Sequence, residues 1–395
     1  MPRLAPALAA NLASSIYALV DFHTLDEAVT ALKTKYGSIL DINPQNMVSG
    51  RTGGPSVLKS RSGFGFVCLG KDTYKGHAFL IFRGTKFLAD WLTNFNMGVS
   101  SSAFGQPMHD GFNQAFHSML PQLSPFISQL KIQGVHSIHC IGHSLGGALA
   151  TRCAEQIKSS TATAPYLYTF GAPRVGLRPF ADTLTSNLSA EKMFRVYHRT
   201  DIVPCIPFWP FIHAPTTLGE HYDYYQPSPG EFPGAQWHSM QGYINTVGNQ
   251  GWAALRNRKA KLNDPASIEG WINRTSPISF NLTNLEWLDK AINYVLNKCF
   301  NFVGSFITSI GSGTFTLMDR LAYILSQGIN LAKNLSSLVL ALIRKIMSLL
   351  GMKPVLDKVD ATYAFIRGIF QRLSHRLSMQ CQQVLDSVLI NGHTV

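Results

Sequence analysis

The sequence predicts an α/β fold with a mostly parallel central sheet, followed by an all-helical region. Over residues 1–250, strand-like and helix-like runs alternate with Gly and Pro between them, which is the pattern of parallel sheets covered by helices. From about residue 252 the strand signals end, and long apolar stripes with helical spacing follow. We therefore expect two domains, residues 1–250 and residues 251–395.

Composition limits the class of protein. A chain of 395 residues can hold one large domain and a smaller one, and its 46% apolar content excludes a disordered chain. The net charge of +12 is uneven, because residues 1–250 carry 18 basic and 14 acidic residues while residues 251–395 carry 16 and 8. A basic, apolar tail suits an anionic membrane surface, and a soluble helical domain with basic faces is the alternative. Without a nucleic-acid motif beside this charge, we expect no nucleic-acid partner.

The N-terminal segment superficially resembles a secretion signal. Polar residues interrupt its apolar run, however, and Leu12, Ile16 and Leu19 form a helical stripe. We expect a helix docked on the first domain, with a signal peptide as the alternative, and no clear transmembrane run. The expected location follows: synthesis in the cytoplasm, export by a non-classical route and action at membranes.

The six cysteines show no CxxC pair, and Cys68, Cys140 and Cys153 lie in predicted core elements. We therefore expect buried free thiols rather than disulfides or metal ligands. No metal or cofactor is expected.

The first domain shows its elements as short apolar or amphipathic runs. Strands are expected at residues 64–69, 78–82, 135–141, 166–170 and 194–197, and helices at 111–130 and 145–158. Residues 204–233 are rich in Pro, Gly and aromatic residues without periodicity, and we expect a loop there.

The second domain is marked by three apolar stripes. They run from Leu285 to Ile310, from Leu317 to Leu350 and from Val355 to Leu377, with breaks at residues 311–313 and 351–354. Three long amphipathic helices are expected. A compact bundle packed on the first domain and a membrane-engaging module are both compatible with these stripes.

Residues 142–147, Gly-His-Ser-Leu-Gly-Gly, stand between a predicted strand and a predicted helix. A serine with glycine two positions before and after it is typical of the nucleophile elbow of α/β-hydrolases. The glycines are needed because the serine backbone is strained and strand and helix pass close to it. The helix N-terminus would favour a developing negative charge. An ordinary glycine turn is the alternative.

A serine nucleophile needs a base and a carboxylate that orients the base, in the chain order Ser, Asp or Glu, His. Asp201 follows the strand at 194–197, although it would also suit an ordinary turn before Pro204. His213, His221 and His238 compete for the base. We favour His238, because it stands at a loop-to-helix junction from which a side chain can reach the serine.

An acyl-transfer site also needs two donors for the oxyanion. The N–H of Leu145 follows the nucleophile, and Thr85 follows a strand that ends in Arg-Gly. Residues 86–97 have the apolar spacing of an amphipathic helix, either a lid over the site or a plain surface helix. The lid side chains would be Phe87, Leu88, Trp91, Leu92 and Phe95.

Six motifs in order resemble the class 3 (fungal-type) lipase family over about residues 60–245. They are Phe-Arg-Gly-Thr at 82–85 with Asp90-Trp91, His-Asp-Gly-Phe at 109–112, Gly-His-Ser-Leu-Gly-Gly-Ala-Leu-Ala at 142–150, Phe-Gly-Ala-Pro-Arg-Val-Gly at 170–176, Asp-Ile-Val-Pro at 201–204 and His-Ser-Met at 238–240. The resemblance implies an α/β-hydrolase with a helical lid that acts on carboxylic esters of lipids. It implies Ser144, Asp201 and His238 as a triad, with Thr85 and Leu145 in the oxyanion hole.

The activity that follows from this resemblance is a phospholipase A or an acylglycerol lipase working through an acyl-enzyme. The basic tail favours phospholipid membranes as the surface. By analogy with secreted lipase effectors, an antibacterial toxin with an immunity protein as partner is a further hypothesis. A membrane-binding or scaffold protein on an inactive hydrolase fold is the alternative from another class.

Overall fold

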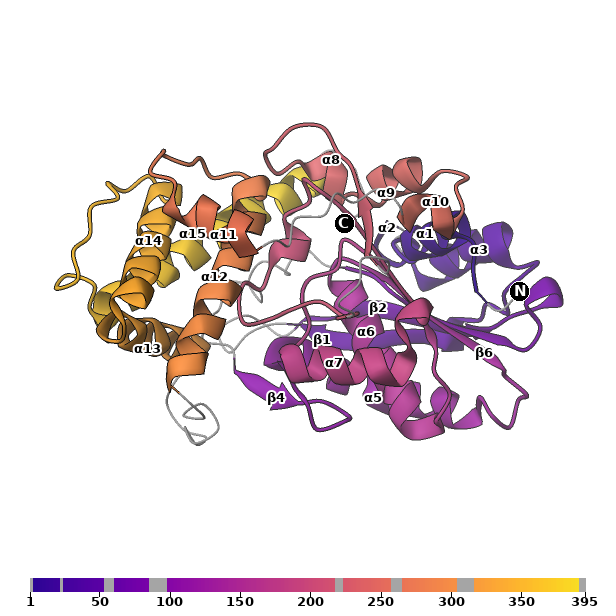
Figure 1. The fold of residues 1–395 in the computed structure, drawn as a ribbon. Coiled ribbons are helices and arrows are strands. Elements are labelled where there is room, and N and C mark those ends of the chain that lie inside the picture. Colours follow the sequence, from indigo (N-terminus) through magenta and orange to yellow (C-terminus); the bar gives the residue numbers. More distant parts are fainter. Residues whose placement is uncertain are drawn as a thin grey trace.

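A twisted sheet forms the centre of the molecule. The computed structural model describes residues 3–21, 24–52, 60–84, 98–216, 223–256, 265–303 and 316–390. Within these residues the sheet lies between two layers of helices, and a group of longer helices lies beside it (Figure 1).

The sheet has seven strands in the order β1-β2-β3-β6-β7-β8-β9. Within this sheet, the pairs β1–β2 and β2–β3 are antiparallel. The pairs β3–β6, β6–β7, β7–β8 and β8–β9 are parallel. The strands are β1 Met47–Thr52, β2 Ser60–Leu69, β3 His77–Phe82, β6 Ser137–His143, β7 Tyr166–Phe170, β8 Met193–His198 and β9 Asp223–Gln226, with a separate antiparallel pair β4 Val99–Ser101 and β5 Pro107–His109.

Helices cover both faces of the sheet. Helices α5, α6 and α7 lie on one side, and α1, α9 and α10 lie on the other (Figure 1). The helices of this part are α1 Pro6–Ser15, α2 Ala18–Asp21, α3 Leu25–Tyr36, α5 Asp110–Gln129, α6 Leu145–Thr161, α7 Arg178–Leu188, α8 Ala235–His238, α9 Met240–Val247 and α10 Trp252–Arg256, and the short 3₁₀ turns are Pro44–Asn46, Asp72–Tyr74, Ala190–Lys192 and Val203–Cys205.

The central strands form because their side chains are buried on both faces. Every residue of β3 and β6 is buried, as expected where helices cover both sides of a parallel sheet. Helix α1 packs against β3, β6 and β7, with Leu12 and Ile16 in the core. The five predicted strands and the helices at 111–130 and 145–158 are confirmed, with ends shifted by up to four residues.

One part of the predicted loop at 204–233 is a strand. Residues 223–226 form β9, which pairs parallel with β8 and places Tyr224 in the core. The strand is short and stands in a Pro- and Gly-rich stretch, so its local composition indicated a loop. Pairing with β8 and packing against Trp252 of α10 stabilise it instead.

The C-terminal region is a bundle. Its helices are α11 Pro265–Asn273, α12 Leu282–Val303, α13 Leu317–Asn330, α14 Lys333–Leu349 and α15 Tyr363–Ile390. The apolar stripes meet inside it, with Leu288 and Ile292 of α12 and Leu342 and Ile346 of α14 fully buried. Most of the apolar surface of these helices is therefore covered by the helices themselves.

The expectation of three long helices is wrong in two places. The second stripe belongs to two helices, α13 and α14, which pack against each other after a reversal at Leu331 and Ala332. The reversal itself contains no Gly or Pro, although Gly328 and Asn330 stand in the last turn of α13 and are residues typical of helix ends. The third stripe forms α15, which begins only at Tyr363. Val355 and Val359 were expected in this helix but lie in the irregular segment before it, 66% and 87% exposed.

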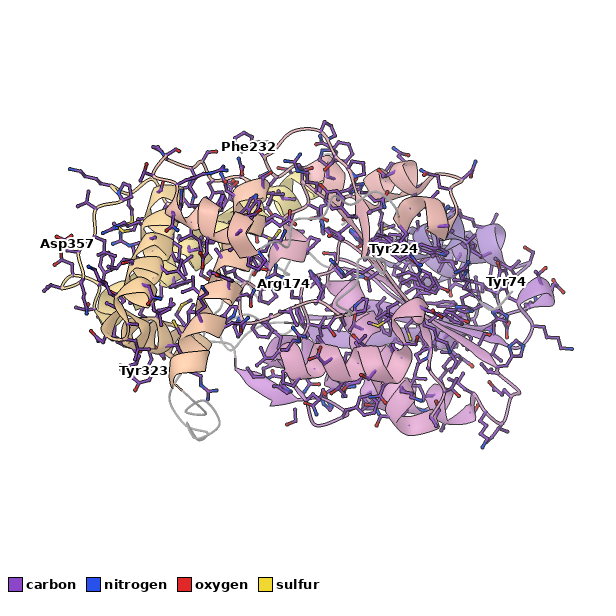
Figure 2. All side chains as sticks on the ribbon, in the orientation of Figure 1. Tyr74, Arg174, Tyr224, Phe232, Tyr323 and Asp357 are labelled. Carbon is purple, nitrogen blue, oxygen red and sulfur yellow. The ribbon has the colours of Figure 1, made fainter. Side chains whose placement is uncertain are left out.

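The bundle is joined to the α/β part by polar contacts and by packing. Arg174, which follows β7, lies between the two parts (Figure 2) and donates from Nη1 to Oδ1 of Asp289 on α12 at 2.8 Å. The Leu282 N–H donates to the Glu231 carbonyl at 3.0 Å, and α15 packs against α8.

All six cysteines are free, as expected, and Cys205 alone among them is half-buried rather than buried. Within the described ranges, no helix combines the length and the apolar character needed to cross a bilayer.

Candidate active site

Ser144 occupies a sharp turn between β6 and α6. Its φ of 56° and ψ of −130° lie outside the regions that non-glycine residues favour, and its N–H donates to the Phe170 carbonyl at 3.0 Å. A Cβ added to Gly142 would lie 2.0 Å from the Gly146 carbonyl oxygen, and one added to Gly146 would lie 2.2 Å from that of Phe82. The glycines therefore permit the close approach of strand and helix that the strained serine requires.

The structure brings Ser144, His238 and Asp201 together. His238 Nε2 lies 3.0 Å from Ser144 Oγ, and His238 Nδ1 lies 3.0 Å and 2.9 Å from the two carboxylate oxygens of Asp201. All three residues are at most 1% exposed. Asp201 follows β8, and His238 is the last residue of α8, separated from α9 by Ser239 alone. A hydroxyl, an imidazole and a carboxylate in this order can remove the serine proton as the oxygen attacks a carbonyl carbon.

Tyr243 on α9 is a site residue that the sequence did not indicate. Its hydroxyl donates to Oδ2 of Asp201 at 2.6 Å, and the Val203 N–H donates to Oδ1 at 3.0 Å. Burial and the neighbouring Asp201 carboxylate raise the pKa of Tyr243, so the phenol keeps the proton that it donates. With the His238 ring, the buried carboxylate thus accepts hydrogen bonds from three different donors.

The rest of the predicted site is described in part. Leu145 is the first residue of α6, where helix N–H groups point toward the serine. Gly84 also borders the nucleophile, because a Cβ added to it would lie 2.8 Å from Ser144 Cβ. Thr85 and the predicted lid residues Phe87, Leu88, Trp91, Leu92 and Phe95 lie outside the described residues.

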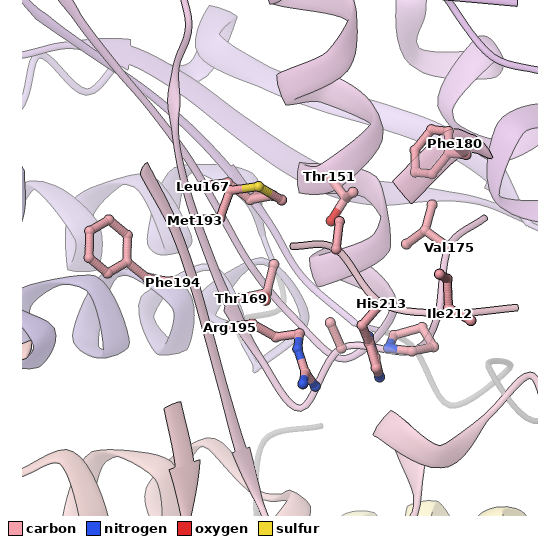
Figure 3. A pocket seen from close by; sticks show the side chains of 13 residues that line it. Thr151, Leu167, Thr169, Val175, Phe180, Met193, Phe194, Arg195, Ile212 and His213 are labelled. Carbon is pink, nitrogen blue, oxygen red and sulfur yellow. The ribbon is translucent and has the colours of Figure 1, made fainter. Parts of the chain in front are cut away.

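The competing histidine His213 lies elsewhere. It lines a pocket with Thr151, Thr169 and Arg195 (Figure 3), and its Nε2 donates to the Pro204 carbonyl at 2.7 Å. His221 lies outside the described residues. Among the residues that the structure describes, no three His, Cys, Asp or Glu side chains are grouped to hold a metal ion.

The strand order, the elbow and the layered helices are those of an α/β-hydrolase, the fold that the sequence predicted. Comparison with solved structures finds, among others, the nonglycosylated LIP2 lipase of Yarrowia lipolytica. It is 22% identical with a TM-score of 0.43, over 58% of this chain and 80% of that one.

Curated relatives match the same part of the chain. A secreted mono- and diacylglycerol lipase 1 of Fusarium solani is 33% identical over 156 residues, which are 38% of this chain and 45% of that protein. A lipase of Rhizomucor miehei is 29% identical over 36% of this chain and 40% of its own length. A chloroplastic phospholipase A(1), DAD1, of Arabidopsis thaliana is 27% identical over 39% of this chain and 40% of its own length. The chain thus spans less than half the length of these relatives.

Residues 79–211 match the family model of class 3 lipases. This stretch contains Ser144, Asp201 and both glycines of the elbow, while His238 lies beyond it. Over residues 79–211, the chain is therefore similar to the class 3 lipases, the family that its six motifs resemble.

Proposed function

We propose that this protein is a serine hydrolase of lipid carboxylic esters, a phospholipase A or an acylglycerol lipase. The observation that carries the proposal is the continuous hydrogen-bonded chain from Ser144 through His238 to Asp201, all three side chains being buried. The relatives named as mono- and diacylglycerol lipase and as phospholipase A(1) support the substrate class.

In the proposed mechanism, Ser144 Oγ attacks the acyl carbonyl carbon while His238 Nε2 accepts its proton. The Asp201 carboxylate holds the ring through Nδ1–H and stabilises the imidazolium. The tetrahedral oxyanion takes hydrogen bonds from the Leu145 N–H and from Thr85. His238 then protonates the departing alcohol, leaving an acyl-enzyme. Water, deprotonated by His238, cleaves this ester, releases the fatty acid and restores the serine.

The test is release of fatty acid from phosphatidylcholine and phosphatidylglycerol vesicles and from a triacylglycerol emulsion. Ser144→Ala should lower the rate by about 10³-fold or more, while vesicle binding persists. Ser128→Ala, on the exposed side of α5, is the matched control and should retain wild-type rates. An inert wild-type protein that still binds vesicles would favour the alternative, a membrane-binding protein on an inactive hydrolase fold. Preference for the anionic vesicles would support the membrane as the working surface.

The finer proposal is an antibacterial toxin that attacks membranes after non-classical export and is neutralised by an immunity protein in its producer. The basic C-terminal region supports action at an anionic membrane. Expression in the cytoplasm of a test bacterium should be tolerated, whereas directing the same chain to the periplasm should kill, and Ser144→Ala should abolish the killing. Harmless periplasmic expression of active enzyme would contradict the toxin proposal and leave the hydrolase proposal standing.

A further inference from the structure

Tyr17, between α1 and α2, reaches the candidate active site from the N-terminal segment. The residue is 4% exposed, and its hydroxyl lies 3.0 Å from the Gly84 nitrogen and 2.7 Å from Nδ1 of His143. On the far side of that ring, Nε2 of His143 lies 2.7 Å from the carbonyl oxygen of His238. These contacts form one continuous chain of hydrogen bonds.

The direction of each bond follows from the groups involved. The His238 carbonyl can only accept, so the proton of the neutral His143 ring is on Nε2. Nδ1 is then an acceptor and the Tyr17 hydroxyl donates to it. The Gly84 N–H can only donate, and the Tyr17 oxygen accepts from it. Burial and the neighbouring His238 ring hold the pKa of His143 well below its usual range, so this arrangement persists through neutral and mildly acidic pH.

The chain joins segments that are far apart in the sequence. Gly84 immediately precedes Thr85, the proposed oxyanion donor, and its backbone lies against Ser144. His143 immediately precedes Ser144, and the accepting carbonyl belongs to His238 itself. One hydroxyl therefore connects the backbone before the oxyanion donor, the residue before the nucleophile and the main chain of the base.

We propose that Tyr17 is a positioning residue that fixes the oxyanion turn at Gly84 and, through His143, the backbone of His238 relative to Ser144. The inference rests on the proposed function, because it assigns Tyr17 a role in that same reaction. Its hydrogen bonds to Gly84 and His143 act on the segments that carry the oxyanion donor, the nucleophile and the base. Such a residue affects the transition state, where oxyanion donors and base must be aligned, more than it affects substrate binding.

The direct test is Tyr17→Phe, which removes the hydroxyl and keeps the ring. With a soluble p-nitrophenyl butyrate ester, kcat should fall about ten-fold, the rate equivalent of one buried hydrogen bond, and KM should stay within about two-fold. Tyr36→Phe is the matched control, because it removes a buried hydroxyl that donates to the Asn11 carbonyl at 3.1 Å in the same N-terminal part. It should lower the melting temperature about as much as Tyr17→Phe and leave kcat unchanged.

A double-mutant cycle that combines Tyr17→Phe with His143→Gln tests whether Tyr17 acts through His143. If Tyr17 acts partly through His143, the double variant should lose less than the product of the two single losses. Losses that multiply, or a Tyr17→Phe variant that lowers only the melting temperature, would overturn the proposal.

Failure of the proposed function has a different signature, which is a wild-type enzyme inert on every ester. In that case, the chain of hydrogen bonds from Tyr17 through His143 is tested by ¹⁵N NMR of histidine-labelled full-length protein. The Nδ1 resonance of His143, assigned with His143→Gln, should shift in Tyr17→Phe and stay in place in Tyr36→Phe. An unshifted Nδ1 resonance in Tyr17→Phe would overturn the proposal that Tyr17 acts through His143.

Discussion

The carboxylate of Asp201 is almost completely withdrawn from water, with 1% of the residue exposed. A buried charge is stable only when its hydrogen-bonding capacity is used, and here the His238 ring, the Val203 N–H and the Tyr243 hydroxyl share it. The Val203 N–H lies two residues from Asp201 in the chain, and the His238 ring was already expected in the triad. Tyr243 is the third, and its distance in the chain gave no indication of the contact.

Tyr243→Phe should weaken both the site and the fold. It removes the donor at 2.6 Å from Asp201 Oδ2 and leaves that oxygen to the His238 ring. We expect a loss of about 1–2 kcal/mol in the free energy of unfolding and a fall in kcat of about three- to ten-fold. Urea unfolding and ester hydrolysis measure the two effects. A variant with unchanged kcat would show that the tyrosine supports the fold alone.

The site residues that could be predicted are those with a signal in the nearby sequence or in the chain order. Ser144 carries a local signal in its glycines, and Asp201 and His238 follow from chain order and from their places at element ends. Tyr17 and His143 act through contacts between residues 126 positions apart, and no periodicity or spacing encodes that distance. Such contacts come from the folded sheet and had to be observed.

At the scale of elements, the approach of α6 to β3 is set by one position. The Cα of Gly146 lies so close to β3 that a methyl group there would be 2.2 Å from the Phe82 carbonyl oxygen and 2.5 Å from its carbon. Both are backbone atoms, which cannot rotate away as a side chain would. The spacing between helix and strand, and therefore the placing of Ser144, depends on this glycine.

Gly146→Ala should accordingly destabilise the protein by about 3 kcal/mol or more, or prevent folding. Gly270→Ala is the matched control, because Gly270 lies within α11 and an added Cβ would meet no atom within 4 Å. Alanine has the higher helix propensity, so this control should be neutral or more stable by up to about 1 kcal/mol. Thermal unfolding of both variants gives the comparison, and equal melting temperatures would contradict the steric explanation.

Elements with a strong local pattern were predictable and short ones were not. The strands β3, β6 and β7 are apolar runs, and α5 and α6 have clear helical periods. The strand β9 has four residues, and its stability comes from pairing with β8. The reversal between α13 and α14 needs only Leu331 and Ala332, so one continuous stripe represented two helices.

At the scale of the whole molecule, the stripes of the C-terminal region predicted helices but not what they pack on. The structure places α12 and α15 against the segments that carry Arg174 and His238. Their packing partners depend on shape and on polar contacts between distant residues, which a stripe does not specify. The Arg174–Asp289 ion pair is such a contact, with side chains 10% and 21% exposed.

Asp289→Ala should leave the Arg174 guanidinium largely buried without this carboxylate. We expect a loss of about 2–3 kcal/mol, below the range for fully buried pairs because Asp289 is partly exposed. Hydrogen exchange in α12 should become faster. Asp182→Ala is the control, since it breaks the Arg178–Asp182 pair, whose side chains are 62% and 45% exposed, and should cost about 0.5 kcal/mol or less. Equal losses in the two variants would show that the pair does not fasten the bundle.

The contact of α15 with α8 has a consequence for the order of events during synthesis. The ribosome makes His238 long before Tyr363, and at roughly 5–20 residues per second the helix α15 follows it by on the order of ten seconds. During that interval the nascent α/β part can form its sheet and elbow while one flank of the helix that bears His238 remains uncovered. Full support of the histidine is thus a late event in biogenesis, tied to translation of the bundle.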